Sequence, residues 1–168
     1  SGGFSRFRAT DVATTSNFSD RTKRGSFLIR VSSKGEYGMR AMVELARVYG
    51  RGPKPLHEVA RIQNISVAYL EQIVALLRQA GLVESTRGAY GGYSLARKPE
   101  AITVGQIVRA LEGPIAPREC VAEVRDSDAC GLQDECSTRL VWKKMRDGIK
   151  EALDSTTLAD LLTTHPPA

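Results

Sequence analysis

The sequence predicts a mainly α-helical protein organised around a winged helix-turn-helix, with a two-stranded β wing and a long C-terminal dimerisation helix. Three observations support this fold class. Apolar residues recur at helical spacing through most of residues 34–162. A glycine-rich stretch at 82–95 carries the strand signal and has the form of a hairpin. An apolar stripe within residues 141–152 is wider than one short neighbouring helix needs.

The stretch from Ser66 to Gly81 is predicted to be the central helix. Its apolar residues at helical spacing are Val67, Leu70, Ile73, Val74 and Leu77. Ser66 is a natural N-cap, because its hydroxyl can accept a hydrogen bond from an unpaired N–H group of the first turn. Gly81 is expected to end the helix, because glycine enters the left-handed conformation without steric cost.

A shorter helix is predicted just upstream, over residues 56–65. Its inward-facing residues are expected to be Leu56, Val59, Ala60 and Ile62. A tight turn at Asn64 and Ile65 joins it to the central helix, which is the layout of a helix-turn-helix. The alternative is an ordinary helical hairpin. DNA binding is favoured because the outward residues are small or hydrogen-bonding, namely Ala68, Tyr69, Glu71, Gln72 and Ala75.

Two short β-prone runs, 82–85 and 93–95, follow the central helix. The loop between them, 86–92, is rich in glycine and carries Arg87, which is typical of a hairpin tip. A helix followed by a basic-tipped hairpin indicates a recognition helix with a wing.

The helix before the helix-turn-helix is predicted to run through Tyr49. A capping box of Ser33 and Glu36 should start it, because each side chain would bind the other residue's N–H group. Residues 30–113 are therefore assigned to a winged helix-turn-helix DNA-binding domain. Residues 1–29, rich in Ser, Thr, Arg and Gly, are expected to be a disordered extension or a cloning-derived segment.

After the wing, Thr103 is predicted to cap a helix that ends at Leu111. A cysteine-rich loop, 114–136, has few large apolar residues, so a ligated metal would order it. Residues 137–168 are assigned to the dimerisation helix, 137–153, and a final short helix capped by Ser155. The residues of the pairing stripe are Val141, Trp142, Met145, Gly148, Ile149 and Ala152.

Charge is distributed unevenly along the chain. Residues 31–99 carry ten basic and five acidic side chains, whereas residues 100–168 carry eight basic and twelve acidic ones. The basic excess coincides with the helix-turn-helix and the wing, as a surface that contacts phosphates requires. No apolar run reaches the length of a membrane span, so no membrane partner is expected.

Three cysteines, Cys120, Cys130 and Cys136, fall within seventeen residues. Without a recognisable secretory signal, a reducing, cytoplasmic location and a metal or redox site are expected rather than a disulfide framework. An enzyme is not expected, because His57 and His165 lack partners for a nucleophilic triad and no glycine loop has a phosphate-binding motif.

Several segments resemble the bacterial winged-helix regulators of the IscR, NsrR and CymR type. They include SSKGEYGMRAMVELA, YLEQIVALLRQAGLV, STRGAYGGYSLAR and CSTRLVWKKMRDGIKEALDSTTLADL. The resemblance covers roughly residues 30–162. It implies a homodimer with antiparallel pairing of the long C-terminal helices, bound to double-stranded DNA at a near-palindromic operator. By matching positions, it implies DNA contacts by Ser66, Tyr69, Glu71, Gln72, Arg87, Gly88 and Tyr90. Arg87 would enter the minor groove.

The resemblance also implies that the three cysteines hold an iron–sulfur cluster, of the 2Fe-2S or the 4Fe-4S type. The spacing of Cys120 and Cys130 is wider than in IscR-like members, and Ser137 to Arg139 stand where those members have a histidine. NsrR-like members use a carboxylate of the partner subunit, and the matching residue here is Glu36. Two interpretations of Glu36 therefore stay open: it is the fourth ligand of the cluster, or it belongs to the capping box with Ser33.

Three hypotheses about function follow. The first is a transcription regulator that senses iron–sulfur status, redox state or nitric oxide through the cluster. The second keeps DNA binding but makes the cysteines a zinc site or a thiol switch, because thiolates bind either metal well. The third is an electron-transfer iron–sulfur protein, which would not need a wing or a basic helix-turn-helix.

Overall fold

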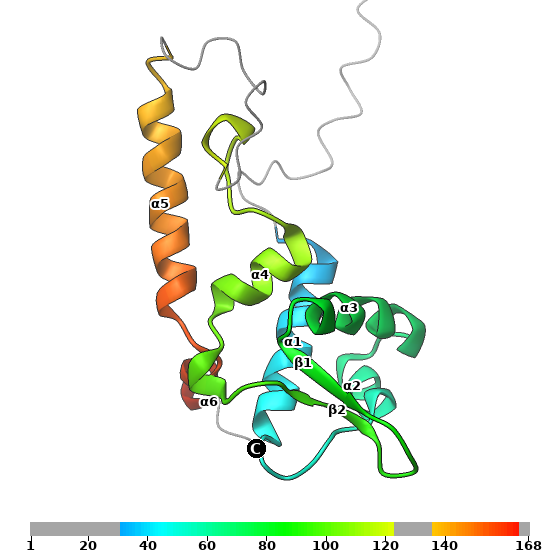
Figure 1. Cartoon of the computed structure of the whole chain (residues 1–168). Helices are drawn as coiled ribbons and strands as arrows, with labels where there is room; N and C mark the ends of the chain where they lie inside the picture. The colour runs from blue at the N-terminus through cyan, green and yellow to red at the C-terminus, as the bar shows by residue number, and fades with distance from the viewer. Residues whose placement is uncertain (1–30, 123–135, 165–168) are drawn as a thin grey trace, which may run out of the picture. The chain divides into compact units, whose positions relative to one another are not determined.

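The computed structural model describes residues 31–122 and 136–164. The proposed extension 1–29, Cys130, His165 and the centre of the cysteine-rich loop lie outside the described residues. Within the described ranges there are six α-helices and one antiparallel pair of strands (Figure 1). The elements are α1 (Ser33–Arg47), α2 (Leu56–Gln63), α3 (Val67–Gln79), β1 (Val83–Thr86), β2 (Gly92–Leu95), η1 (Pro99–Ala101), α4 (Val104–Glu112), η2 (Glu119–Val121), α5 (Arg139–Ser155) and α6 (Leu158–Thr164). The mainly α-helical winged helix-turn-helix predicted from the sequence is confirmed.

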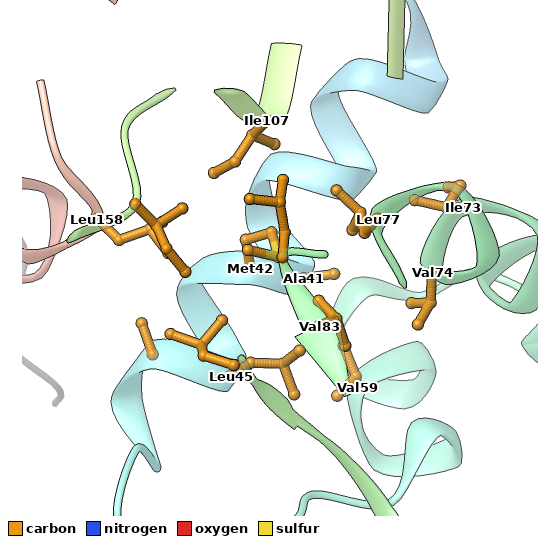
Figure 2. Close-up of a cluster of buried hydrophobic side chains, with 14 of the residues drawn as sticks. Ala41, Met42, Leu45, Val59, Ile73, Val74, Leu77, Val83, Ile107 and Leu158 are labelled. Atoms are coloured by element: carbon orange, nitrogen blue, oxygen red, sulfur yellow. The ribbon is translucent and has the colours of Figure 1, made fainter. Parts of the chain in front are cut away.

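One apolar core joins the helix-turn-helix, the wing and the last helix. Helix α1 contacts α2, α3, α4 and α6, and its buried face is centred on Met42, which is fully buried. Figure 2 shows Ile73, Val74 and Leu77 of α3 and Val83 of β1 converging on this face, with Leu158 of α6 closing it from the opposite side. Because these side chains come from four separate elements, the core fixes α3 and the wing relative to α1.

The N-terminal cap of α1 differs from the predicted one. Ser32, not Ser33, is the N-cap, and its hydroxyl accepts a hydrogen bond from the Gly35 N–H at 3.1 Å. The helix therefore begins one residue earlier than a Ser33 cap allows, which moves Glu36 past the N3 position that a capping box needs. The predicted Ser33–Glu36 capping box is wrong. The helix ends at Arg47, two residues before the predicted Tyr49.

The helix-turn-helix has the predicted turn. Asn64 adopts a left-handed conformation at φ 53°, and the Ile65 N–H donates to the Ala60 carbonyl at 3.1 Å. Gly81 is also left-handed, at φ 69°, and follows Ala80, the C-cap of α3. Two of the predicted inward residues face solvent instead: Ile62 is 47% exposed and Val67 39% exposed, because each lies at the end of its helix, beyond the core contact.

The C-terminal elements return to the domain core. Thr103 caps α4 as predicted, and it forms a full capping box with Gln106. Helix α5 starts and ends two residues later than predicted. The cap of α6 is Thr157, not Ser155: the Asp160 N–H donates to the Thr157 hydroxyl at 3.2 Å, and the Thr157 N–H donates back to the Asp160 carboxylate at 2.8 Å. Ser155 instead lies in the last turn of α5 and donates to the Glu151 carbonyl.

No helix in the described ranges combines the length and the apolar character that crossing a membrane requires.

Candidate nucleic-acid interface and cysteine segment

Helix α3 presents a buried face and a polar outer face. Leu70, Ile73, Val74 and Leu77 are at most 1% exposed, so they hold the helix against α1 and the wing. Ser66 caps the helix, with its hydroxyl accepting from the Tyr69 N–H at 3.2 Å. The side chains of Glu71 and Gln72 lie on the exposed face, as predicted for residues that read bases.

Tyr69 lies at the border of the two faces. Its ring packs edge-on against Tyr37 of α1, with the ring centroids 6.2 Å apart and the planes at 85°. The side chain is half-buried and packs at the margin of the core, so it is less exposed than the other residues predicted for the outward face. Edge-to-face pairs of this kind are favourable, so the contact with Tyr37 helps to orient the ring of Tyr69.

The wing is a short hairpin whose tip projects away from the core (Figure 1). Val83 pairs with Leu95 and Thr86 with Gly92. The first strand therefore lies one residue later in the chain than predicted, and the second begins one residue earlier. Gly88 in the tip has φ 114°, a conformation that favours glycine. Arg87 is exposed and Tyr90 is 95% exposed. All three tip residues named from the sequence are therefore accessible to a large ligand.

The base of the wing is fastened to the loop between α1 and α2. Lys54 and Tyr93 exchange two backbone hydrogen bonds of 2.9 Å. A side chain on Gly92 would collide with the Lys54 backbone, so glycine permits this close approach. The Lys54 ammonium is 3.0 Å from the Glu44 carboxylate of α1, and both side chains are largely buried. The sequence did not indicate this attachment, because the pairing joins residues far apart in the chain.

The cysteine segment is described at its two ends. Cys120 lies in η2 and Cys136 lies just before α5, and both are half-buried. The Cys136 thiol is 3.2 Å from the Thr138 hydroxyl. Among the described residues, no group of three or more His, Cys, Asp or Glu side chains is arranged to hold a metal ion. The third predicted ligand, Cys130, lies outside these residues.

Glu36, the predicted fourth ligand, lies on the exposed side of the first turns of α1. Its carboxylate accepts a hydrogen bond from Arg40 at 2.5 Å, and both side chains are 54% exposed. Glu36 therefore pairs with Arg40, four residues along the helix, and not with the Ser33 N–H group of the predicted capping box. The carboxylate is accessible to another molecule, because an exposed pair of this type is weak.

Helix α5 is the least buried helix of the described chain. None of its seventeen residues is buried, and Leu140 and Val141 are 63% and 53% exposed. The predicted stripe splits by exposure: Trp142, Met145 and Ile149 are half-buried, whereas Val141, Gly148 and Ala152 are exposed. An apolar face on a helix this exposed is typical of a contact with another molecule.

The comparisons with known proteins decide the family. The model of the Rrf2 family, described as an iron-dependent transcriptional regulator, matches residues 31–164. The chain belongs to the Rrf2 family. It is 49% identical to the HTH-type transcriptional regulator CymR of Bacillus subtilis over 79% of this chain and 89% of CymR. It is 37% identical to the HTH-type transcriptional regulator IscR of Sodalis glossinidius, over 82% of this chain and 81% of that protein.

Solved Rrf2 structures have the same fold. The structure of CymR, the global cysteine regulator of B. subtilis, superposes with a TM-score of 0.67 at 47% identity and covers 82% of this chain and 98% of that one. The T. potens IscR structure gives a TM-score of 0.65 at 46% identity and covers 81% of this chain and 88% of that one. The resemblance to the IscR and CymR type is thus confirmed. As an Rrf2 protein, the chain is a DNA-binding transcription regulator and not an enzyme.

Proposed function

We propose that this Rrf2 protein binds a near-palindromic operator as a homodimer, paired through the exposed face of α5. The observation that carries the proposal is the absence of any buried residue in this seventeen-residue helix, although it bears Leu140, Val141 and Trp142. Covering these side chains removes apolar surface from water, which favours association. A two-fold dimer matches a two-fold operator, because each recognition helix takes one half-site.

Within each half-site, the recognition helix and the wing have separate roles. Glu71 and Gln72 read base edges in the major groove, with Ser66 and Tyr69 beside them. Arg87 enters the minor groove, where a narrow, negative groove attracts a guanidinium group. Support for these roles comes from exposure, because Ser66, Glu71 and Gln72 are exposed at the start and on the outer face of α3 and Arg87 is exposed at the tip of the wing.

The proposed sensor is an iron–sulfur cluster held by Cys120, Cys130 and Cys136, with Glu36 of the partner subunit as the fourth ligand. Three soft thiolates suit iron, and a carboxylate would give one weaker ligand at an exchangeable corner. Two observations support the donor set: Cys120 and Cys136 are half-buried, and Glu36 is exposed and is not a cap. When bound, the cluster supplies reactivity toward oxidants or nitric oxide, or a readout of iron–sulfur supply.

A second candidate uses the same cysteines as a zinc site or a thiol switch. The similarity to CymR, for which an oxidised form has been solved, favours a thiol switch. A solved Staphylococcus aureus CymR structure is of an oxidised form, with 38% identity to this chain. Both candidates keep the same DNA-binding surface and differ in the chemistry at sulfur.

Anaerobic purification followed by absorption spectroscopy and iron and sulfide analysis distinguishes the candidates. A visible chromophore with matching iron and sulfide supports the cluster, and replacing any of the three cysteines with Ala should abolish it. Zinc without a chromophore, or thiols without metal, supports the second candidate.

The role of Glu36 is tested by Glu36→Ala, with Glu100→Ala as an exposed control on η1. We expect Glu36→Ala alone to shift the spectrum and to accelerate cluster loss. Heterodimers of a Glu36→Ala subunit and a cysteine-free subunit then show whether the carboxylate comes from the partner. An unchanged spectrum and unchanged lability in Glu36→Ala would mean that the fourth ligand is another group.

A further inference from the structure

Helix α5 is attached to the rest of the chain at two places along its length. It contacts α4 near its C-terminal end and η2 near its middle. None of its residues is fully buried, although Trp142, Met145 and Ile149 are half-buried, so apolar contacts hold the helix only in part. The polar contacts at these two places add directional restraints on α5.

The first attachment is a paired hydrogen bond between α5 and α4. The Arg109 guanidinium donates to both Asp154 oxygens, Nη1 to Oδ1 at 2.6 Å and Nη2 to Oδ2 at 3.0 Å. Lys150 donates to Asp154 Oδ2 at 2.9 Å. Gly105 makes room for this carboxylate, because a Cβ there would collide with Asp154 Oδ1 and lie 2.7 Å from Arg109 Nη1. A bidentate contact of this type is geometrically specific.

The backbone reinforces the same attachment. Directly after α5, the Thr156 carbonyl accepts from the Val104 N–H at 2.8 Å, and the Leu158 N–H donates to the Ile102 carbonyl at 2.9 Å. Leu158 is fully buried in the core. The C-terminal end of α5 is thus fixed to the DNA-binding domain.

The second attachment joins the middle of α5 to the segment that holds Cys120. Arg146 Nη1 donates to the Val121 carbonyl at 3.0 Å. The remaining face of the guanidinium is oriented by Asp147, whose carboxylate is 2.6 Å from Nη2 and 2.8 Å from Nε. Val121 is 2% exposed and directly follows Cys120. The position of this carbonyl therefore depends on the backbone at the cysteine.

We propose that Arg146 is a positioning residue that transmits the state of the Cys120 segment to the direction of α5, with the Arg109–Asp154 contact as the pivot. From residue 154, residue 146 is about 12 Å along the helix and residue 139 about 22 Å, at the usual rise per residue. A shift of about 1 Å at Val121 then moves the first turn of α5 by about 2 Å. In the proposed homodimer the exposed face of α5 pairs the two subunits, so the shift changes the distance between the two recognition helices.

The inference rests on the proposed homodimer, but its central contact is testable in either oligomeric state. We would measure amide hydrogen exchange of the purified full chain for Arg146→Ala and Lys144→Ala. The control removes the same charge from an exposed position of the same helix. Loss of the contact should speed exchange at residues 119–122 by about tenfold in Arg146→Ala alone, as for a hydrogen bond from a charged donor. Equal exchange in both variants would overturn the inference.

Operator spacing provides the second readout. An operator is first selected from random duplexes, and the two half-sites are then moved by one base pair in each direction. The spacing discrimination is the difference in log Kd between the selected operator and the operators with moved half-sites. We expect Arg146→Ala to reduce this difference by at least half, with the affinity for a single half-site and the melting temperature unchanged. Arg146→Lys, which can still donate to the Val121 carbonyl, should restore most of it. A role in stability alone would lower the melting temperature and leave the discrimination intact.

A double-mutant cycle tests the link to the cysteine. Cys120→Ala should change the spacing preference in the wild-type background and have no effect in the Arg146→Ala background. Additive effects, or no effect of Cys120→Ala in the wild type, would overturn the inference. A wild type that sediments as a monomer would instead refute the homodimer. The amide-exchange result alone would then test the contact between Arg146 and Val121.

Discussion

Two glycines of α1, one helical turn apart, provide a test of how tightly this helix packs against α4. Gly38 is buried, and a Cβ there would collide with Leu111 Cδ1 and lie 3.1 Å from Ile73 Cγ2. Leu111 is 3% exposed and Ile73 1%, so neither side chain can move away without disturbing the core. At Gly35 the Cβ would meet the end of the exposed Glu112 side chain, which can rotate into solvent.

The expected free energies follow from these surroundings. Overpacking a core costs about 1–3 kcal/mol, and replacing a helical glycine with alanine returns up to about 1 kcal/mol. Gly38→Ala should therefore lower the free energy of unfolding by about 1 kcal/mol, or the melting temperature by about 3–5 °C. Gly35→Ala should be close to neutral, because the gain in helix propensity offsets the lost hydrogen bond between Ser32 and Glu112.

Urea unfolding followed by circular dichroism measures both variants against the wild type. The result that would refute the reasoning is a Gly38→Ala protein at least as stable as the wild type. In that case Leu111 has room to repack, and the contact between α1 and α4 is looser than the structure indicates.

Three further predictions concern DNA binding, assembly and pH. Arg87→Ala should lose about 1–3 kcal/mol of specific DNA binding with an unchanged circular dichroism spectrum; intact affinity in a titration would mean that the wing does not read DNA. Met145→Glu should give monomers in sedimentation, because an unpaired carboxylate would be buried in the pairing face; a variant that stays dimeric moves the interface elsewhere. Hydrogen bonds from Arg109 and Lys150 lower the pKa of Asp154 from 3.8 to about 2. This carboxylate should therefore stabilise the fold above pH 4, and the contribution should disappear as the pH falls toward 2. Because the side chain is one-third exposed, we expect on the order of 1 kcal/mol, measured as the difference between wild type and Asp154→Asn in acid unfolding.

The sequence alone predicted the buried face of a helix where the spacing of the apolar residues is regular. Leu70, Ile73, Val74 and Leu77 are buried as predicted, because one face of a helix can be read from spacing alone. Caps were harder to predict, because both errors fell in runs of hydroxyl residues. Ser32 and Ser33 are adjacent, and Thr157 follows Ser155 and Thr156. Any of these side chains can cap, and tertiary packing selects the residue at which the helix begins.

The attachments that position the candidate site could not be predicted from local sequence. Arg109 and Asp154 are 45 residues apart, and Arg146 and Val121 are 25 apart. No spacing rule links such pairs, because they meet only after α4 and α5 have packed. Likewise, Gly92 was assigned to the turn of the wing, whereas in the structure it allows Lys54 to approach the strand.

The return of α6 to the core has a consequence for how the protein is made. Leu158 lies beside Met42 and Ile107 in the core, although it follows helix α5 in the chain (Figure 2). A ribosome must therefore synthesise the whole of α5 before the DNA-binding core can be completed. Unfinished chains still being translated lack this side chain and should fold incompletely. They would then not compete with finished regulators for the operator.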